Sequence, residues 1–348
     1  MTAVLPGGNN TFVPSHEASG KLVIDYSRNV KKFDVNKYTQ IVKAPKSIGY
    51  YLKCTIDEGG RILDDTALDA LWNDGENAPG GRDGTSEHEY KAFQTARRQW
   101  AFTIGDKAVD QATWDIVAQN AQRKAQQAMT ARTMLALNAM LTTGNHISSH
   151  VVDISAVSGN TGTWAASTSN RQDIKRSLNT ARELILDDTL AAVDIDDLYL
   201  VINSTLARQL AECQEIVEYI KGSPDALAQV RGDLRASNQN AFYGLPAQLY
   251  GLNLIVEKTR RVTSRKRATS TKSQVLPTAT PFICARPGSL EGTYGAPSFS
   301  SLTCFMYEEM TAETKKDKDN RRTSGRVVED YVFILTAPET AVMFQNAV

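Results

Sequence analysis

The sequence predicts an α+β fold, and three observations support this prediction. Residues 106–143 contain neither proline nor glycine and are rich in Ala, Gln, Arg, Met and Leu, which favours one long helix. Helical and strand patterns alternate from residue 171 to residue 286, as expected for helices packed on a sheet. Residues 301–348 have the pattern of long strands that return after the helices. The chain therefore combines an α/β unit with a separate unit of one helix and several strands.

The composition is that of a globular chain with a sizeable core. The chain has 348 residues, of which 41% are hydrophobic and 22% are charged, so about two or three packed units are expected. Lys plus Arg equals Asp plus Glu at 39 each, so any electrostatic role must come from local patches. The N-terminus has no signal-peptide pattern, and no apolar run is long enough to span a membrane. The four cysteines lack metal-ligand spacing and are expected to be buried thiols in a reducing cytoplasm.

The first two segments are expected to form extensions rather than a core. Residues 1–47 have only scattered apolar residues and should lie on another surface or stay mobile. The β-branched and aromatic residues of Ile48–Ile56 and Trp100–Ile104 predict two strands. Between them, residues 57–91 carry ten acidic and three basic residues, a net charge of about −7. A polar loop this long tends to be functional, and we expect it to rest on a neighbouring chain.

The clearest predicted element is a single helix from Asp106 to Thr143. Asp106 can cap this helix and Gly144 can end it, and apolar residues recur at helical spacing from Val109 to Met140. A helix of this length would extend about 50 Å. Its apolar face is narrow and consists largely of alanine, which predicts a helix lying across a sheet rather than in the centre of a bundle.

The rest of the chain alternates between helices and strands and then ends in strands. The segment His146–Gly162 is predicted to be a turn-rich strand or hairpin. The α/β unit, in which Asn203 or Ser204 caps the second helix, is predicted to contain helix Arg171–Leu186, strand Leu198–Ile202, helix Leu206–Ile220, strand Tyr250–Val256 and strand Phe282–Ala285. The C-terminal unit is predicted to contain strand Ser301–Glu308, a charged hairpin turn at Thr311–Asn320, strand Arg326–Thr336 and a last apolar segment at Ala341–Phe344.

Residue types that carry catalysis are present, but they lack a catalytic or metal-binding pattern. His146 and His150 are four residues apart, yet Gly144 interrupts the helix that would align them, and no third ligand is nearby. Five aspartates between Asp187 and Asp197 lack the frame of a calcium loop, so turn formation and solvation explain them better. No phosphate-loop, dinucleotide-binding, hydrolase or zinc-protease motif occurs. We therefore predict no catalytic residue, no cofactor and no metal, and a protein that is not an enzyme.

A basic segment at residues 258–272 allows three interpretations. It carries seven Lys or Arg residues and no acidic residue, a charge of about +7. It could contact a nucleic acid or another polyanion, although no aromatic residue is interleaved for base stacking. It could instead be the solvated tip of a β-hairpin between Leu254–Val256 and Phe282–Ala285. In the third interpretation it pairs with acidic residues of a neighbouring subunit.

The order of these segments resembles that of the major capsid proteins of tailed phages, lambda's among them, which share the fold first seen in a Hong Kong coliphage shell. In this family an N-terminal arm, an extended two-stranded loop and a long spine helix precede an axial domain, and the last strands return to the peripheral domain. The corresponding segments here would be an arm at 1–47, an extended loop at 48–105, a peripheral domain with the spine helix at 106–170 plus 301–348, and an α/β axial domain at 171–300.

Local sequence patterns add to this resemblance. Tyr250–Val256 resembles the late axial strand of the family, and Gly292–Gly295 resembles the re-entry to the peripheral domain. The end of the chain, Phe333–Pro338 followed by Ala341–Phe344, resembles the end of lambda-type coat proteins. The resemblance covers nearly the whole chain and rests on the order of the parts more than on invariant residues.

The resemblance implies a structural coat protein that self-assembles into pentamers and hexamers of an icosahedral phage head. Its location would be the virion, after assembly in the cytoplasm of a bacterial host. The implied partners are other copies of the chain, a portal, and packaged double-stranded DNA contacted without sequence specificity; no membrane is implied. A separate scaffolding protein is also implied, because the chain lacks a long charged helical prefix. Nothing in the sequence assigns a covalent crosslink.

Contacts between neighbouring subunits are expected to involve local charges. A net charge near zero removes long-range repulsion between many copies, and opposite charges can then set their register. The residues predicted to make such contacts are Asp57, Glu58, Asp64 and Asp65 in the acidic loop, and Arg260, Arg261, Arg265, Lys266 and Arg267 in the basic segment.

Three other functions remain open on the sequence alone. An encapsulin-like nanocompartment shell would share the fold but would bind a cargo peptide and enclose no DNA. An α/β enzyme of unrecognised type would show a compact pocket and a small oligomeric state. A phage tail or adaptor protein would form rings or tubes but would lack the spine helix.

Overall fold

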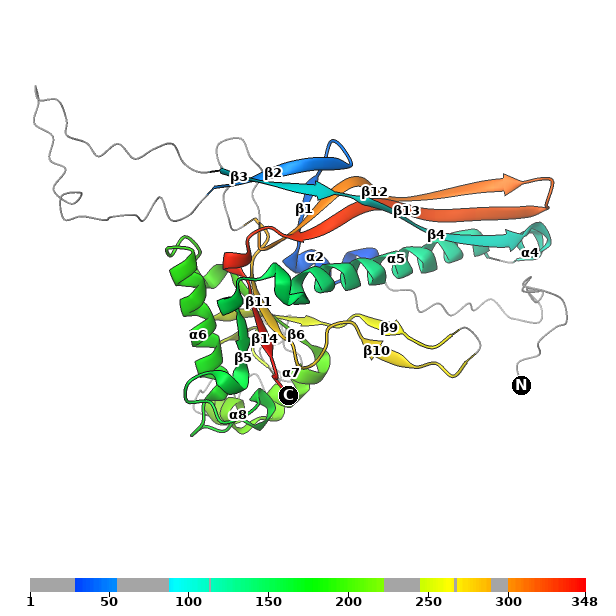
Figure 1. Cartoon of the computed structure of the whole chain (residues 1–348). Coiled ribbons are helices and arrows are strands. Elements are labelled where there is room, and N and C mark those ends of the chain that lie inside the picture. Colours follow the sequence, from blue (N-terminus) through cyan, green and yellow to red (C-terminus); the bar gives the residue numbers. More distant parts are fainter. Residues whose placement is uncertain (1–28, 55–87, 113, 222–244, 266–267, 289–299) are drawn as a thin grey trace, which may run out of the picture.

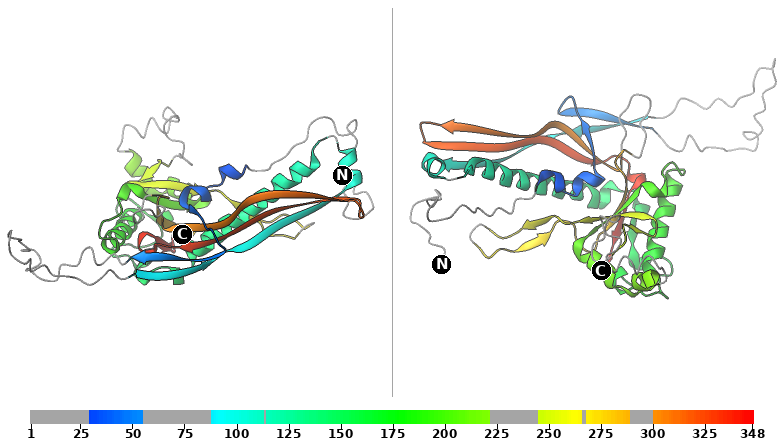
Figure 2. Two further views of the ribbon diagram at one scale, coloured as in Figure 1. Left: turned by 90° about the horizontal axis from the view of Figure 1, so that it is seen from above. Right: turned by 180° about the vertical axis from the view of Figure 1, so that it is seen from behind.

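The α+β fold is confirmed by a computed structural model that describes residues 29–54, 88–112, 114–221, 245–265, 268–288 and 300–348 (Figure 1). A long helix and a four-stranded sheet lie along one another, and a compact unit with a six-stranded sheet lies near one end of them (Figures 1 and 2). A two-stranded ribbon and a two-stranded hairpin extend from these two parts.

The four-stranded sheet supports the long helix. Its strands are, in order across the sheet, β1 (Gln40–Lys43), β12 (Leu302–Asp317), β13 (Arg322–Leu335) and β4 (Ala96–Gly105). Strand β1 runs parallel to β12, and the other pairs are antiparallel. Helix α5 (Ile116–Leu141) packs on one face, where Met129 and Leu137 join Tyr331 and Phe333 in a single apolar cluster. The helix therefore lies across a sheet, as the sequence predicted.

The predicted single helix at 106–143 is wrong, because Ala112, Trp114 and Asp115 are not helical. The structure has a short helix, α4 (Asp106–Gln111), then a break, and then α5. The side chain of Asp115 accepts a hydrogen bond from the amide of Ala118 at 2.9 Å, which caps a new helix start. The sequence did contain this cap signal, because Asp115 is followed by helix-forming residues. The absence of Pro and Gly from the whole stretch nevertheless suggested one continuous helix.

The hairpin β12–β13 is longer than predicted. The charged segment Thr311–Asn320 was expected to be a turn, but the strands continue to Asp317 and resume at Arg322. Ion pairs across the strands join Asp317 to Arg322 at 3.0 Å and Glu313 to Arg326 at 2.8 Å. Opposite charges on neighbouring strands stabilise their pairing, so a charged sequence can remain a strand where one face is exposed.

The compact unit is built on a six-stranded sheet of mixed strand direction. Its strands are, in order, β5 (Val151–Asp153), β14 (Val342–Gln345), β11 (Phe282–Ala285), β6 (Leu198–Asn203), β8 (Leu252–Glu257) and β7 (Gln248–Leu249). Its helices are α6 (Asp173–Asp188), α7 (Ser204–Glu212) and α8 (Gln214–Lys221). Their apolar faces form one core, which includes the edge-to-face pair Trp164 and Phe344 with ring centroids 4.9 Å apart.

Most predicted elements of this unit are confirmed, but one prediction was wrong. The predicted helix Leu206–Ile220 is split at Cys213, whose backbone adopts extended angles. Asn203 caps α7 as predicted, because its side chain accepts a hydrogen bond from the amide of Leu206 at 2.7 Å. The segment His146–Gly162 was predicted to be a turn-rich strand or hairpin, and it is the first of these: one short strand, β5, among several 3-10 turns.

Two segments assigned to the peripheral domain lie in the six-stranded sheet. Strands β5 and β14 pair with each other, and β14 also pairs with β11. This sheet therefore takes strands from both sides of the boundaries placed at residues 170 and 301, because strand pairing joins residues that are distant in the sequence. The domain boundaries elsewhere stay a prediction.

The end of the predicted N-terminal arm lies on its own chain. Phe33 and Tyr38, the latter at the end of helix α2 (Val35–Tyr38), are buried in the apolar cluster beneath α5. The Tyr38 hydroxyl donates to Glu257 at 3.1 Å, and burial raises the pKa of this tyrosine well above its usual value. The arm was expected either to lie on another surface or to stay mobile, and these residues lie on a surface. Residues 1–28 lie outside the described part.

Candidate functional site

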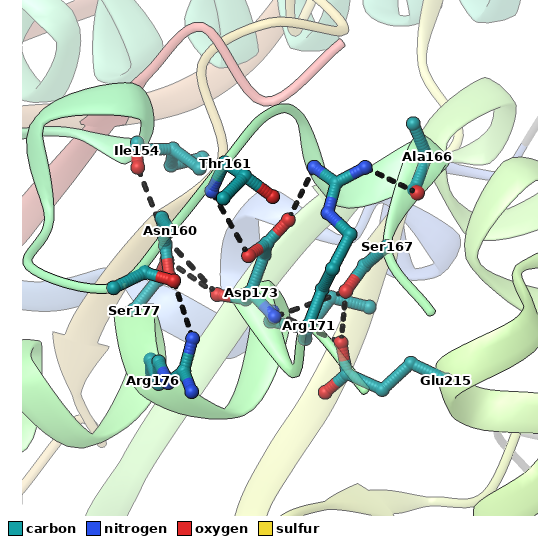
Figure 3. Close-up of polar contacts among 12 residues, drawn as sticks. Ile154, Asn160, Thr161, Ala166, Ser167, Arg171, Asp173, Arg176, Ser177 and Glu215 are labelled. Atoms are coloured by element: carbon teal, nitrogen blue, oxygen red, sulfur yellow. Dashed lines mark hydrogen bonds and ion pairs between the residues drawn. The ribbon is translucent and has the colours of Figure 1, made fainter. Parts of the chain in front are cut away.

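A buried polar cluster joins α6, α8 and the loop before α6 (Figure 3). The carboxylate of Glu215 accepts hydrogen bonds from the Ser167 hydroxyl at 2.5 Å and the Tyr250 hydroxyl at 2.8 Å. It also accepts from the amides of Ile174 and Lys175, at 3.2 and 3.1 Å, in the first turn of α6. A carboxylate at a helix N-terminus satisfies unpaired amides and interacts favourably with the helix dipole. Four donors thus hold Glu215, which is only 4% exposed.

The second carboxylate of this cluster, Asp173, is completely buried. It accepts a hydrogen bond from the Thr161 amide at 3.3 Å and forms an ion pair with Arg171 at 2.6 Å (Figure 3). Asn160 extends the cluster by donating its side-chain amide to the Ser177 hydroxyl at 2.8 Å. Because donors occupy both carboxylates, the cluster fixes the loop to α6 and presents no free general base.

We expect Glu215→Gln to destabilise the folded chain by about 1–3 kcal/mol, because the new amide would set donors against donors in a buried site. Glu218→Gln on the same helix is the matched control. The Glu218 carboxylate is bonded to Gln214 at the surface, so its loss should change stability by less than about 0.5 kcal/mol. Chemical denaturation measures both. Equal stability of the two variants would contradict the role assigned to Glu215.

A second buried charged cluster lies between α5 and the four-stranded sheet. Glu329 is completely buried, and burial raises the pKa of its carboxyl although Arg132 and Arg98 act in the opposite direction. The ring of Tyr331 is within cation–π distance of both guanidinium groups, 4.8 Å from Arg98 and 5.6 Å from Arg132. Burial also raises the pKa of the nearby Cys304 thiol to about 11. These groups lie in the core, where each buried charge depends on its neighbours for compensation.

The two histidines singled out in the sequence join distant segments. His146 Nε2 lies 2.5 Å from the carbonyl oxygen of Met140, near the end of α5. His150 is completely buried, with Nδ1 2.9 Å from the Ala341 carbonyl oxygen and Nε2 2.8 Å from the Asp188 carboxylate. Burial lowers the pKa of His146. Within the described ranges, no three side chains of metal-ligand type gather into a site.

Of the nine residues predicted to contact neighbouring subunits, only three lie in the described part of the chain. The others, outside it, are Asp57, Glu58, Asp64, Asp65, Lys266 and Arg267. Arg260 and Arg261 lie on β9 (Arg260–Val262), which pairs with β10 (Lys272–Gln274) as a separate hairpin. Arg265 lies beyond β9, and all three side chains are exposed. Their contact with a neighbour stays a prediction.

An exposed apolar surface on the ribbon of β2 (Ile48–Cys54) and β3 (His88–Gln94) was not predicted. Ile48, Tyr50, Leu52 and Tyr90 share one face of this ribbon and are 57, 70, 47 and 72% exposed. We call these four residues the ribbon face. The apolar alternation at 48, 50 and 52 was the available signal, but the opposite face carries the aromatic residues Tyr51 and Phe93 beside charged ones, so the sequence could not show which face is buried.

The opposite face of the ribbon is anchored on the four-stranded sheet. Phe93 stacks on Phe305 with ring centroids 4.3 Å apart, and Tyr51 stacks on the same ring at 5.6 Å. Gly49 pairs with Phe93 across the ribbon, and a Cβ atom on Gly49 would lie 2.6 Å from the Phe93 ring. The glycine therefore lets the ring lie flat. The ribbon is fixed at its base, and the ribbon face is left open to solvent.

Comparison with known proteins finds similarity in structure. No protein-family model matches the sequence, and no curated protein matches it. A phage-related protein from Bordetella bronchiseptica RB50 is 12% identical, with 93% of this chain and 94% of that chain covered and a TM-score of 0.57. A chain of the mature capsid of bacteriophage PhiM1 is 9% identical, with 94% and 90% covered and a TM-score of 0.54.

A third similar structure is a capsid chain of a native GTA particle. It is 11% identical, with 97% of this chain and 100% of that chain covered and a TM-score of 0.52. The similarity to all three extends over nearly the full length of both chains, so it concerns the whole fold rather than one unit.

Proposed function

We propose that this chain, which has the tailed-phage capsid fold, is the major capsid protein of a tailed double-stranded DNA phage. In this proposal the chain self-assembles into the pentamers and hexamers of an icosahedral head in the virion, built in the cytoplasm of a bacterial host. The observation that carries the proposal is the similarity of the whole chain to capsid chains. The proposed partners are other copies, a separate scaffolding protein, a portal and packaged DNA, and we assign no catalytic role.

The surfaces of the single chain support an assembled state. The ribbon face exposes four large apolar side chains together, and such patches on soluble proteins commonly mark interaction sites. The hairpin β12–β13 also extends well beyond the compact unit (Figures 1 and 2). A neighbouring copy could cover both surfaces, and ring symmetry would repeat each contact. None of the described helices is both long and apolar enough to cross a membrane.

Electron microscopy of the purified full chain tests the proposal. We expect closed shells or rings when the chain is expressed alone or with a co-expressed scaffold. Nuclease treatment of particles recovered from infected cells should leave protected DNA inside. A monomer under every condition would sink the proposal, whereas shells that enclose protein cargo and never DNA would favour the nanocompartment alternative.

We also propose that the acidic loop and the basic hairpin each contact a neighbouring chain. Reversing Arg265, Lys266 and Arg267 to Glu should hinder ring closure and leave the subunit folded, because the hairpin is separate from both large sheets. One exposed ion pair contributes only about 0–1 kcal/mol, but symmetry repeats it around each ring. Light scattering measures assembly. Wild-type assembly should weaken towards 1 M salt, where the screening length is about 3 Å.

A graded control uses the same three positions. Replacing them with Gln removes the positive charge without adding negative charge, so the assembly defect should be intermediate. If both variants assemble with the yield and salt response of the wild type, the hairpin tip is only solvated and makes no contact.

A further inference from the structure

The hairpin β9–β10 has one face against the long helix. Arg261 and Ser273 lie opposite each other on this face. Arg261 Nη1 lies 3.8 Å from the sulfur of Met134 on α5, and Arg261 Nε donates to the Ser273 hydroxyl at 3.4 Å. The hairpin runs beside α5 in Figure 1, in yellow. Because side chains alternate along a strand, the residues on either side of Arg261 point away from the helix.

The other face of the hairpin opens onto a pocket of about 400 Å³. Arg260 on β9 and Lys272 on β10 are both exposed and lie on this face. The pocket is lined by residues of the hairpin, of the segment after it and of the start of α7: Thr205, Arg260, Lys272, Ser273, Gln274, Leu276, Pro277 and Thr278. No carboxylate is among them. The start of α7 and the hairpin, about 55 residues apart in the sequence, thus form one site, and the hairpin supplies both of its cations.

Two threonine hydroxyl groups line this pocket, and each already accepts a hydrogen bond. Thr205 accepts from the Gln274 side-chain amide at 2.8 Å, and Thr278 accepts from the Asn203 amide at 2.9 Å. A hydroxyl has one hydrogen to donate as well as lone pairs that accept. Neither of them donates to another described residue, so their hydrogens remain available to a ligand.

The two cations are also available. Among the described residues, neither Arg260 nor Lys272 has an ion-pair partner, unlike Arg97, Arg322 and Arg326 on the four-stranded sheet. A guanidinium, an ammonium and two hydroxyl hydrogens therefore converge on one pocket without a competing carboxylate. Such a set of donors fits an anion with several acceptor oxygens, and arginine and lysine are the side chains that most often bind phosphate.

We propose that this pocket binds a phosphate group, and that the phosphate belongs to the backbone of double-stranded DNA. Arg260 and Lys272 would neutralise the phosphate charge, and the hydroxyls of Thr205 and Thr278 would donate to its oxygens. The choice of DNA as the phosphate source rests on the proposed function, whereas the phosphate chemistry does not. The contact would be independent of base sequence, because phosphates carry no base information.

Binding of a short DNA duplex to the unassembled full chain, measured by fluorescence anisotropy at several salt concentrations, tests this site. The variant Arg260→Gln/Lys272→Gln should bind more weakly and lower the slope of log affinity against log salt by about 0.9, the value for one phosphate that is no longer neutralised. The control Lys107→Gln/Lys175→Gln removes the same charge from exposed helix positions and should leave that slope unchanged.

Thr205→Val separates a built site from a merely positive surface. This change removes one hydroxyl donor without altering charge, so affinity should fall several-fold while the salt slope stays constant. Inorganic phosphate should displace DNA from the wild type more than chloride does at equal ionic strength, and it should lose this advantage in Arg260→Gln/Lys272→Gln. Phosphate binding without DNA binding would identify free phosphate as the ligand and overturn the assignment to DNA.

Two results would overturn the phosphate site itself. One is equal weakening of DNA binding by the pocket variant and by the control, which would mean that the total charge of the chain alone sets the affinity for DNA. The other is a pocket variant that fails to assemble yet binds DNA and phosphate as the wild type does, which would make the two cations a contact to a neighbouring chain. Failure of the wild type to form shells would count against the proposed function and leave the phosphate measurements interpretable.

Discussion

Ala128→Pro is expected to abolish shell assembly and to destabilise the subunit by about 3 kcal/mol or more. Ala128 is completely buried near the middle of α5, where the helix packs on the four-stranded sheet. Proline at this position removes the hydrogen bond from its own amide to the carbonyl of Lys124, and its ring clashes with that carbonyl. The helix would bend at its centre and separate from the sheet. Chemical denaturation measures the stability loss, and negative-stain microscopy measures assembly.

Ile116→Pro is the matched control for this experiment. Ile116 is the first residue of α5, where an amide has no partner within the helix and proline is well tolerated. Asp115 before it already has non-helical angles, with φ −73° and ψ 88°, so proline at position 116 would not have to force it out of the helical region. We expect near-normal stability and normal particles from this control. Normal particles from Ala128→Pro as well would contradict the central role assigned to α5.

Arg132→Met should destabilise the subunit by about 3–5 kcal/mol, because it leaves Glu329 buried with less compensating charge. Glu329→Leu combined with Arg132→Met should recover much of this loss, since neither charge then needs compensation. Chemical denaturation of the two single variants and the double variant gives the coupling energy between the residues. Additive effects would show that the two residues do not interact. Arg123→Met at an exposed position of the same helix controls for the removal of a cation.

The same cluster predicts how stability depends on pH. Burial raises the pKa of Glu329 above its ordinary value of 4.5, so the folded chain holds this proton more tightly than the unfolded chain does. The contribution of Glu329 to the unfolding free energy therefore rises as the pH falls through the raised pKa towards 4.5. The variant Glu329→Gln has no carboxyl group that could bind this proton. Its stability relative to the wild type should be highest at neutral pH and should decline as the medium becomes acidic, as thermal unfolding at several pH values can measure.

Elements with strong local signals were predictable from the sequence. The helix α6 has an apolar stripe, α7 has Asn203 as a cap, and β6 and β11 are short runs of apolar and β-branched residues. Each of these signals acts within a few residues, so it can be recognised without the rest of the chain. The helix breaks at Asp115 and Cys213 were missed. Neither break contains Pro or Gly, the residues that most clearly mark the end of a helix in a sequence.

The candidate sites divide in the same way. The charges of the acidic loop and the basic hairpin follow from counting residues, and so does the expectation that they face solvent or another chain. The burial of Arg132 and Glu329 could not be predicted, since charged residues are normally exposed. Only the packing of α5 on the four-stranded sheet encloses these two side chains. The phosphate pocket was missed too, because Thr205 and Arg260 become neighbours only when the hairpin folds beside α7.

The sequence by itself determined the order of a long helix, an α/β unit and return strands, because periodicity, caps and turn residues act locally. It also determined the positions of the unbalanced charges. Only the tertiary structure decided that β14 joins the six-stranded sheet, that one face of the ribbon stacks on Phe305 while the ribbon face stays exposed, and that the hairpin opens on a pocket. The physical reason is that strand pairing and burial depend on which distant segments meet. Where large apolar or aromatic residues lie on both faces of a strand, its sequence alone does not show which face will be covered.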